Sequence, residues 1–450
     1  MKQQPAQRGM DLVVTISRIV VGGLFSFSGF VKAVDPLGTA YKIEDYLIEM
    51  GLSPLLPLTV ALALVMVVAE FTLGMMLLLG VWRKWSLRLI ALFLLFFTPL
   101  ALWIALAEPV EDCGCFGDAI HISNWETFYK NLVLSAAVVL LLVQRERITP
   151  LFRRRTEAAA AALFILFFGV LFALHNLYRL PLFDFRPYRI GASIPQQMQA
   201  DPAKADVYET FFIYQKDGKK KEFPEEDFPW NDSTWTFVEM QTRLVKEGVK
   251  PPIEDLVVTG LSPDEESGSL TADRDITDTI LMEPSWQFLM IATSLEEMNE
   301  RHLERFMAMQ RFAAERGYPF YLLTASSPEE VAAWEEQHHS GFRFAGADEK
   351  VLKTMIRSNP GLMLLREGVV INKWDDSRVP SPIPDGIAPE ASKLIRPMDP
   401  QVRSVTDLSV VSLLLFLPLL FLKWLERGRS VRTWPWRTGY HREDETSIKK

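Results

Sequence analysis

Six long apolar runs constrain this 450-residue chain more than any other feature of its sequence. A helix of about 20 residues spans roughly 30 Å, the thickness of the hydrocarbon layer of a membrane, so each run can cross a bilayer, the fourth with its polar flanks. Burial of six such runs inside a soluble protein would be exceptional. The sequence therefore predicts a polytopic α-helical membrane protein with spans at residues 11–31, 55–80, 87–107, 128–143, 157–177 and 408–425.

Basic residues in the short loops predict the orientation of these spans. Lysines and arginines gather before the first run, between the second and third, between the fourth and fifth, and after the sixth. The positive-inside rule assigns these segments to the cytoplasm. We therefore expect a bacterial inner-membrane protein with both termini in the cytoplasm. The loop after the third run and the large soluble region of residues 178–407 are expected in the periplasm, where thiols meet oxidising conditions.

The soluble region is polar and acidic, and the whole chain has a formal net charge of −8. Nucleic-acid binding requires a basic excess that neutralises phosphates. This sequence shows none, so we expect no nucleic-acid partner. The lipid bilayer is the one partner that the apolar runs require.

The first part of the soluble region holds weak strand patterns. Asp217-Gly218 between two strand-like runs predicts a hairpin, and the segment to about residue 284 is rich in proline and acidic residues. From Trp286 onward the pattern becomes regular. The short strand "WQFLMIA" is followed by a helix ending at Gly317, and the alternation continues to a hairpin that turns at Glu367-Gly368.

This β-α-β-α, helix, β-β order resembles the thioredoxin fold over about residues 285–376. Asn359-Pro360 stands where that family places its cis-proline. Thioredoxins carry Cys-x-x-Cys after the first of these strands, but residues 292–297 read "ATSLEE" here. Without a thiol the domain cannot exchange disulfides, which leaves binding or scaffolding as its role.

The only two cysteines of the chain, Cys113 and Cys115, stand in the loop after the third run. A disulfide between them needs a sharply bent backbone, which Gly114 allows because glycine adopts positive φ without penalty. The small ring would be labile and open to exchange with a substrate dithiol. A structural staple is the alternative, although closing so short a loop removes little entropy from the unfolded chain.

A metal site is a further alternative for this loop. Asp118 and His121 follow the cysteines, so two thiolates, a carboxylate and an imidazole could bind zinc or copper. Cysteine metal sites usually show wider Cys-x-x-Cys spacing, and we do not favour this one.

Ionisable residues lie inside the first two apolar runs. Arg18 is in the first run and Glu70 in the second. A charge inside a membrane span is costly unless it is paired, and both residues fall toward the cytoplasmic half of antiparallel helices. We therefore expect an intramembrane ion pair, which either docks the two helices or takes part in proton or quinone chemistry.

The membrane part resembles a known group of proteins. "SRIVVGGLFSFSGFVKAVDPLG" resembles the start of DoxX-type membrane proteins, and "CGCFGDA" followed by "NWETFYKNLVL" resembles the related MauE group. The resemblance covers about residues 11–143. It implies a four-helix redox-associated module, similar in outline to vitamin K epoxide reductase and DsbB. Those quinone-linked enzymes use a second cysteine pair, which this chain lacks. The sequence establishes no cofactor. A quinone is the one candidate that the similarity to these enzymes suggests.

Together these patterns predict five parts and one leading function. The function is envelope thiol-disulfide chemistry through Cys113 and Cys115, with the soluble domain binding a periplasmic client or thiol-disulfide partner. The alternative is a non-catalytic scaffold with a structural cysteine pair. The C-terminal tail, with Trp434 and Trp436, is expected to contact lipid headgroups or to be disordered. The predicted parts are a DoxX/MauE-like module (1–145), a basic loop and fifth helix (146–180), a linker and strand-rich segment (181–284), a thioredoxin-like domain (285–405), and a sixth helix and tail (406–450).

Overall fold

The computed structural model describes residues 5–110, 113–200, 207–216, 218–225, 227–246, 248, 250–263, 270–381 and 400–432. Two compact units make up the chain: unit 1 is Met1–Phe183 with Gln401–Lys450, and unit 2 is Asp184–Pro400. The tail residues Trp434 and Trp436 lie outside the described residues, as does Asp217 of the predicted hairpin turn.

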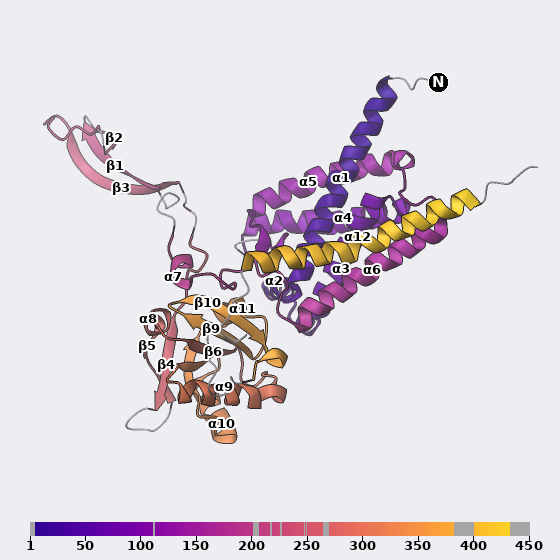
Figure 1. Cartoon of the computed structure of the whole chain (residues 1–450). Helices are drawn as coiled ribbons and strands as arrows, with labels where there is room; N and C mark the ends of the chain where they lie inside the picture. Colours follow the sequence, from indigo (N-terminus) through magenta and orange to yellow (C-terminus); the bar gives the residue numbers. More distant parts are fainter. Residues whose placement is uncertain are drawn as a thin grey trace, which may run out of the picture. The chain divides into compact units, whose positions relative to one another are not determined.

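Unit 1 is built from long helices (Figure 1). They are α1 (Pro5–Val34), α2 (Pro36–Glu49), α3 (Thr59–Leu79), α4 (Arg83–Ala107), α5 (Asn124–Val143), α6 (Arg155–Tyr178) and α12 (Pro400–Arg432), with the short turns η1 (Ser53–Leu58), η2 (Gly117–Ala119) and η3 (Arg145–Arg147). Within the described residues, six helices are long and apolar enough to cross a membrane. The chain is therefore a polytopic helical membrane protein, and the six predicted spans are confirmed.

Small residues bring α1 and α3 into direct backbone contact. A Cβ atom on Gly29 would lie 2.2 Å from the backbone nitrogen of Phe71, and one on Gly74 would lie 2.3 Å from that of Ser26. Only glycine fits at such distances, as is common where membrane helices pack closely. These contacts fix the register of the two antiparallel helices and so decide which polar side chains meet between them.

The helix α2 was not predicted, because the apolar pattern indicates only a loop between the first two spans. Asp35 caps its first turn by accepting a hydrogen bond from the backbone N–H of Gly38, and Pro36 occupies the first helical position, where its fixed φ and missing N–H are tolerated. Thr39, Ala40 and Leu47 are buried, so α2 packs one face against the rest of unit 1.

The last helix, α12, completes unit 1 alongside α3 and α6 (Figure 1). Leu415 and Leu419 pack in one apolar cluster with Ala161 and Ile165 of α6. The carboxylate of Glu426 accepts hydrogen bonds from the backbone N–H groups of residues 153 and 154, at 2.6 and 3.0 Å. It thereby satisfies donors at the start of α6 that the helix itself cannot pair.

Unit 2 is rich in sheet. Its described elements are α7 (Ile194–Gln197), β1 (Val207–Lys216), β2 (Lys219–Pro224), β3 (Thr236–Lys246), β4 (Val258–Pro263), β5 (Leu270–Asp275), α8 (Thr277–Leu281), β6 (Gln287–Ala292), η5 (Glu300–His302), α9 (Leu303–Glu315), β7 (Phe320–Thr324), α10 (Pro328–His338), β8 (Arg343–Ala347), α11 (Glu349–Met355), β9 (Gly361–Arg366), β10 (Val369–Asp375) and η6 (Asp376–Arg378). The described part contains a seven-stranded sheet of order β10-β9-β6-β7-β8-β4-β5 and a three-stranded sheet of order β2-β1-β3.

The larger sheet contains the predicted strand and helix order. Strands β6, β7 and β8 are parallel, while β9 and β10 run antiparallel to their neighbours. Every residue of β6 is buried, which explains its continuous apolar sequence. The peptide bond of Asn359-Pro360 is cis, as predicted. The helix after β6 begins at Leu303, whereas the apolar pattern predicts a start at Leu295.

The smaller sheet is formed by β1, β2 and β3. Lys216 pairs with Lys219 in the hairpin, so the predicted turn between β1 and β2 is confirmed. The strand β3 was not singled out from the sequence. Aromatic rings pack on this sheet, with Phe212 stacked 4.4 Å from Phe228 and Tyr214 at 5.6 Å from Phe237 between ring centroids.

A buried ionic cluster fixes the first residues of unit 2 to β10. Asp184 forms ion pairs with Arg186 at 2.8 Å and Lys373 at 2.9 Å. Burial alone would raise the pKa of Asp184, but the two cations outweigh it and hold that pKa below its usual range. Burial lowers the pKa of Lys373 to about 8, although Asp184 opposes this shift. The segment therefore depends on complete pairing, because a lone buried charge is costly.

Candidate thiol site

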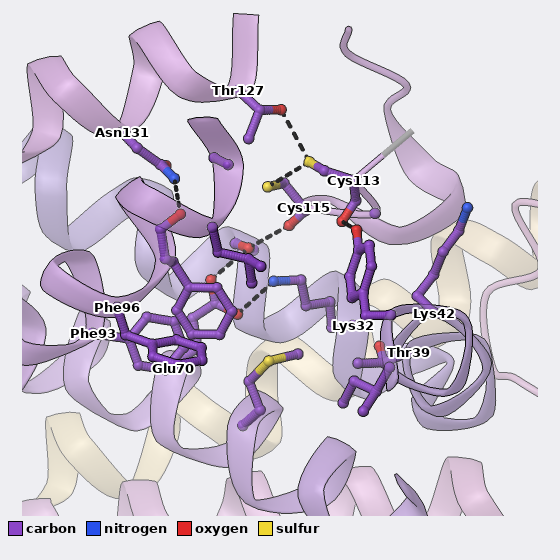
Figure 2. Close-up of a pocket in the computed structure, with 18 of the residues that line it drawn as sticks. Lys32, Thr39, Lys42, Glu70, Phe93, Phe96, Cys113, Cys115, Thr127 and Asn131 are labelled. Carbon is purple, nitrogen blue, oxygen red and sulfur yellow. Dashed lines mark hydrogen bonds and ion pairs between the residues drawn. The ribbon is translucent and has the colours of Figure 1, made fainter. Parts of the chain in front are cut away.

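Unit 1 contains a cavity of about 560 Å³ beside the cysteine loop (Figure 2). Its wall is mainly apolar, with Phe93, Phe97 and Leu100 of α4 and Val65 of α3 among the lining residues. The polar side chains come from α1, α2, α3, α5 and the loop. They are Ser28, Lys32, Thr39, Lys42, Tyr46, Glu70, Cys113, Cys115, Thr127, Lys130 and Asn131.

The two thiols lie against each other at this cavity. Cys113 Sγ donates a hydrogen bond to Cys115 Sγ at 2.9 Å, and both cysteines are free. Gly114 between them has φ of +63°, so the expected backbone bend is present. A Cβ at this position would also lie 3.2 Å from Cγ of Lys42. The turn thus requires glycine both for its conformation and for the space beside α2.

Hydrogen bonds from three helices hold the loop. The hydroxyl of Tyr46 in α2 donates to the carbonyl oxygen of Cys113 at 2.8 Å. Ser28 Oγ in α1 lies 2.6 Å from the carbonyl oxygen of Cys115. Thr127 Oγ1 in α5 lies 3.0 Å from Cys113 Sγ. Because α5 starts with a capping box between Ser123 and Glu126, Thr127 is held in the first turn of a well-defined helix.

The surroundings of the two thiols shift their pKa values in opposite directions. The hydrogen bond from Cys113, against the effect of burial and with help from the charges of Lys130 and Lys32, lowers the pKa of Cys115 to about 6. The pKa of Cys113 is raised, first because this thiol donates to Cys115 and second because it is buried. The pair therefore favours the proton on Cys113 and the thiolate on Cys115.

Lys32 and Glu70 pair with each other in the buried part of the site. Lys32 Nζ lies 2.8 Å from Glu70 Oε2, and each side chain is only 9% exposed. The predicted pair of Arg18 with Glu70 is wrong. Arg18 instead donates to the carbonyl oxygens of Thr149 and Leu78, at 2.9 and 3.0 Å. The glycine contacts set a helix register in which Arg18 lies opposite residue 78, eight residues and roughly 12 Å along α3 from Glu70.

A family model described as methylamine utilisation protein MauE matches residues 10–144. This range contains α2 to α5, most of α1, and the cysteine loop. Residues 10–144 are a MauE-like membrane module. The match associates the module with a membrane protein of a redox-related system. A second model, described as a domain of unknown function (DUF8463), matches residues 208–247, which correspond to β1, β2 and β3. No curated protein and no solved structure matches the chain.

The MauE-like module does not assemble the alternative metal site. No group of three or more His, Cys, Asp or Glu side chains with metal-binding geometry occurs among the described residues. Asp118 lies in η2, and His121 follows that turn. The four predicted ligands are therefore not brought together.

Sequence reasoning missed several polar residues of this module. Ser28, Tyr46, Thr127 and Lys130 contact or face the cysteine loop, yet each is a single polar residue in or beside an apolar run. Lys32 could have been found, because it is an ionisable residue at the end of the first run. The remaining residues carry no signal in one sequence, since their importance depends on the helix register.

Proposed function

We propose that the MauE-like module takes part in thiol-disulfide exchange through Cys113 and Cys115. The observation that carries the proposal is the thiol pair itself: two sulfur atoms 2.9 Å apart, bordering a cavity, with one pKa lowered and the other raised. These are the only cysteines of the chain, so any exchange partner must be a second molecule.

The exchange step follows from the separated pKa values. When the pair is oxidised, a substrate thiolate attacks Cys113 Sγ and the disulfide releases Cys115, the better leaving group, as a thiolate. The second substrate thiolate then attacks the substrate sulfur of the mixed disulfide and releases Cys113, which takes up a proton. The substrate loses two electrons and gains a disulfide, while the pair gains two electrons. The reverse sequence reduces a substrate disulfide.

The residues of the cavity fit the candidate quinone. A flat apolar ring suits the walls formed by Phe93 and Phe97, and the ammonium group of Lys32 has hydrogens to donate to a carbonyl as well as to Glu70. A bound quinone would supply a two-electron acceptor for the reduced pair.

Unit 2 is proposed to contain a thioredoxin-like domain, over about residues 285–376, that binds a client. The strand order β10-β9-β6-β7-β8 with a parallel β6-β7 pair supports this interpretation. The segment after β6 holds Thr293 and Ser294 where thioredoxins place a thiol. We propose that this domain lies in the periplasm of a bacterium and recruits a protein whose thiols the membrane module serves.

Redox titration of the purified full-length protein with thiol trapping tests the exchange function. We expect a reversible midpoint between about −120 and −270 mV, the range of exchange-active proteins. Cys115→Ser, which keeps Cys113, should trap mixed disulfides in cells. A pair still oxidised below about −300 mV, without mixed disulfides, would establish the structural staple and the scaffold. Stoichiometric zinc or copper in the reduced protein would replace the exchange function with a metal site.

A further inference from the structure

Buried groups beside the thiols form a connected chain from Cys115 to Lys32. Ser28 Oγ lies 2.6 Å from the carbonyl oxygen of Cys115 and 2.8 Å from Glu70 Oε1, and Glu70 Oε2 pairs with Lys32. We propose that reduction of the cysteine pair transfers one proton to Glu70, so that Glu70 is the proton acceptor of the thiol site. This inference rests on the proposed exchange function.

The hydrogen-bond geometry at Ser28 supports a protonated Glu70 when the thiols are free. A serine hydroxyl has one hydrogen to donate, and neither a carbonyl oxygen nor a carboxylate oxygen has any. If Glu70 were ionised, Ser28 would have to share its one hydrogen between two acceptors, Glu70 Oε1 and the carbonyl oxygen of Cys115. If Oε1 of Glu70 carries a proton, it donates to Ser28 and Ser28 donates to the carbonyl of Cys115. Both contacts are then satisfied, as buried polar groups require.

The charge of the thiol pair links this proton to the redox state. The free pair holds a thiolate on Cys115, and the charges of Cys115 and Glu70 disfavour each other. In the disulfide the thiolate charge is absent, so Glu70 can ionise against Lys32. Reduction therefore reads: disulfide, two electrons and two protons give the Cys113 thiol, the Cys115 thiolate and the neutral acid of Glu70. Charge and atoms balance with one proton on Cys113 and one on Glu70.

Other charged groups also face the cavity and are part of this balance. Lys130 of α5 favours the thiolate, but this side chain is only half-buried, whereas Lys32 and Glu70 are buried. From α2, Lys42 and Tyr46 line the same cavity. The lining residues of α4 are not titratable, and α6 contributes none to this wall within the described residues. Glu70 is thus the buried carboxylic acid of the site.

Infrared difference spectroscopy of the full-length protein in nanodiscs tests the inference directly. On reduction we expect the carbonyl stretch of a protonated carboxylic acid to appear. The band should be absent in Glu70→Gln and unchanged in Glu49→Gln, whose exposed carboxylate lies at the end of α2. If Glu70→Gln does not fold, Ser28→Ala should still shift the band, because the acid loses its hydrogen-bond acceptor. A band that stays in Glu70→Gln, or that is missing in the wild type, would overturn the inference.

The pH dependence of the reduction potential gives an independent test. Between pH 7 and 8, two protons per two electrons change the reduction equilibrium 100-fold per pH unit, or about 59 mV. The variant Glu70→Gln should show a tenfold change, or about 30 mV, because Lys32 still favours the thiolate of Cys115 and only Cys113 takes up a proton. A wild-type slope of about 30 mV contradicts the role of Glu70 but leaves the exchange function intact. Absence of any reversible titration would instead refute the exchange function.

Discussion

At the scale of single residues, the hydrogen bond between the thiols predicts how Cys115 reacts. In the wild type, the alkylation rate of Cys115 should rise as the pH passes upward through about 6, because the thiolate is the nucleophile. Cys113→Ala removes the donor while burial remains, so the pKa of Cys115 should rise and alkylation at pH 7 should slow by about tenfold or more. Peptide mass spectrometry under reducing conditions measures this rate at Cys115 alone.

Cys113→Ser is the matched control, because its hydroxyl keeps a hydrogen-bond donor at the same position. It should restore part of the low-pH reactivity. Equal profiles for the alanine and serine variants would show that the hydrogen bond does not set the reactivity of Cys115.

The thiol pair could be identified from the sequence, but its electrostatic surroundings could not. The positive φ of Gly114 could be predicted, because a Cys-x-Cys turn that joins its sulfurs needs a residue without a Cβ. The partner of Glu70 could not be predicted. Its identity depends on which turn of α1 lies opposite, and that register follows from glycine contacts along the whole helix pair.

At the scale of elements, the apolar runs predicted the six long helices because length and composition decide membrane insertion. The prediction of shorter elements depends on local sequence signals, which are weaker than the long apolar runs. The Asp35-Pro36 start of α2 is a helix-capping signal, but it stands between two spans, where the apolar pattern indicates only a loop. The strand β3 carries charged and polar residues on an exposed sheet, so its alternation was indistinct.

The close contact of α1 and α3 predicts opposite effects for two neighbouring glycines. Gly29→Ala places a Cβ 2.2 Å from the backbone of Phe71, so the helices must separate, and the free energy of unfolding should fall by about 1–3 kcal/mol. Gly23→Ala meets nothing within 4 Å and should be neutral or stabilising by up to about 1 kcal/mol. Denaturant unfolding in detergent measures both. Similar losses in the two variants would mean that this contact does not limit the stability of unit 1.

At the scale of the whole molecule, the sequence predicted a membrane module followed by a sheet-rich soluble region, and both are present. Charge and hydropathy are averages over many residues, so predictions based on them stay correct even when an individual element is assigned wrongly. The full seven-stranded sheet could not be predicted, because β4 and β5 join it from a segment with weak strand patterns. The side of the membrane on which each loop lies stays a prediction from the distribution of basic residues.

Thiol labelling of intact cells tests that orientation. In cells treated with a reductant, Cys115, the thiol with the lowered pKa, should react with a membrane-impermeant reagent before lysis. In a background of Cys113→Ser and Cys115→Ser, Trp230→Cys at a residue 75% exposed in unit 2 should also react before lysis. Glu146→Cys, whose side chain is 66% exposed in the loop before α6, should react only afterwards. The reverse pattern would invert the predicted topology.

The bond between Glu426 and the start of α6 also has a consequence during synthesis. Glu426 and residue 154 are 272 positions apart, and the whole of unit 2 lies between them. At roughly 5–20 residues per second, the ribosome adds Glu426 about 14–54 s after residue 154. During that time the backbone N–H groups of residues 153 and 154 cannot form their hydrogen bonds with Glu426. Unit 1 can therefore reach its final packing only after unit 2 has left the ribosome.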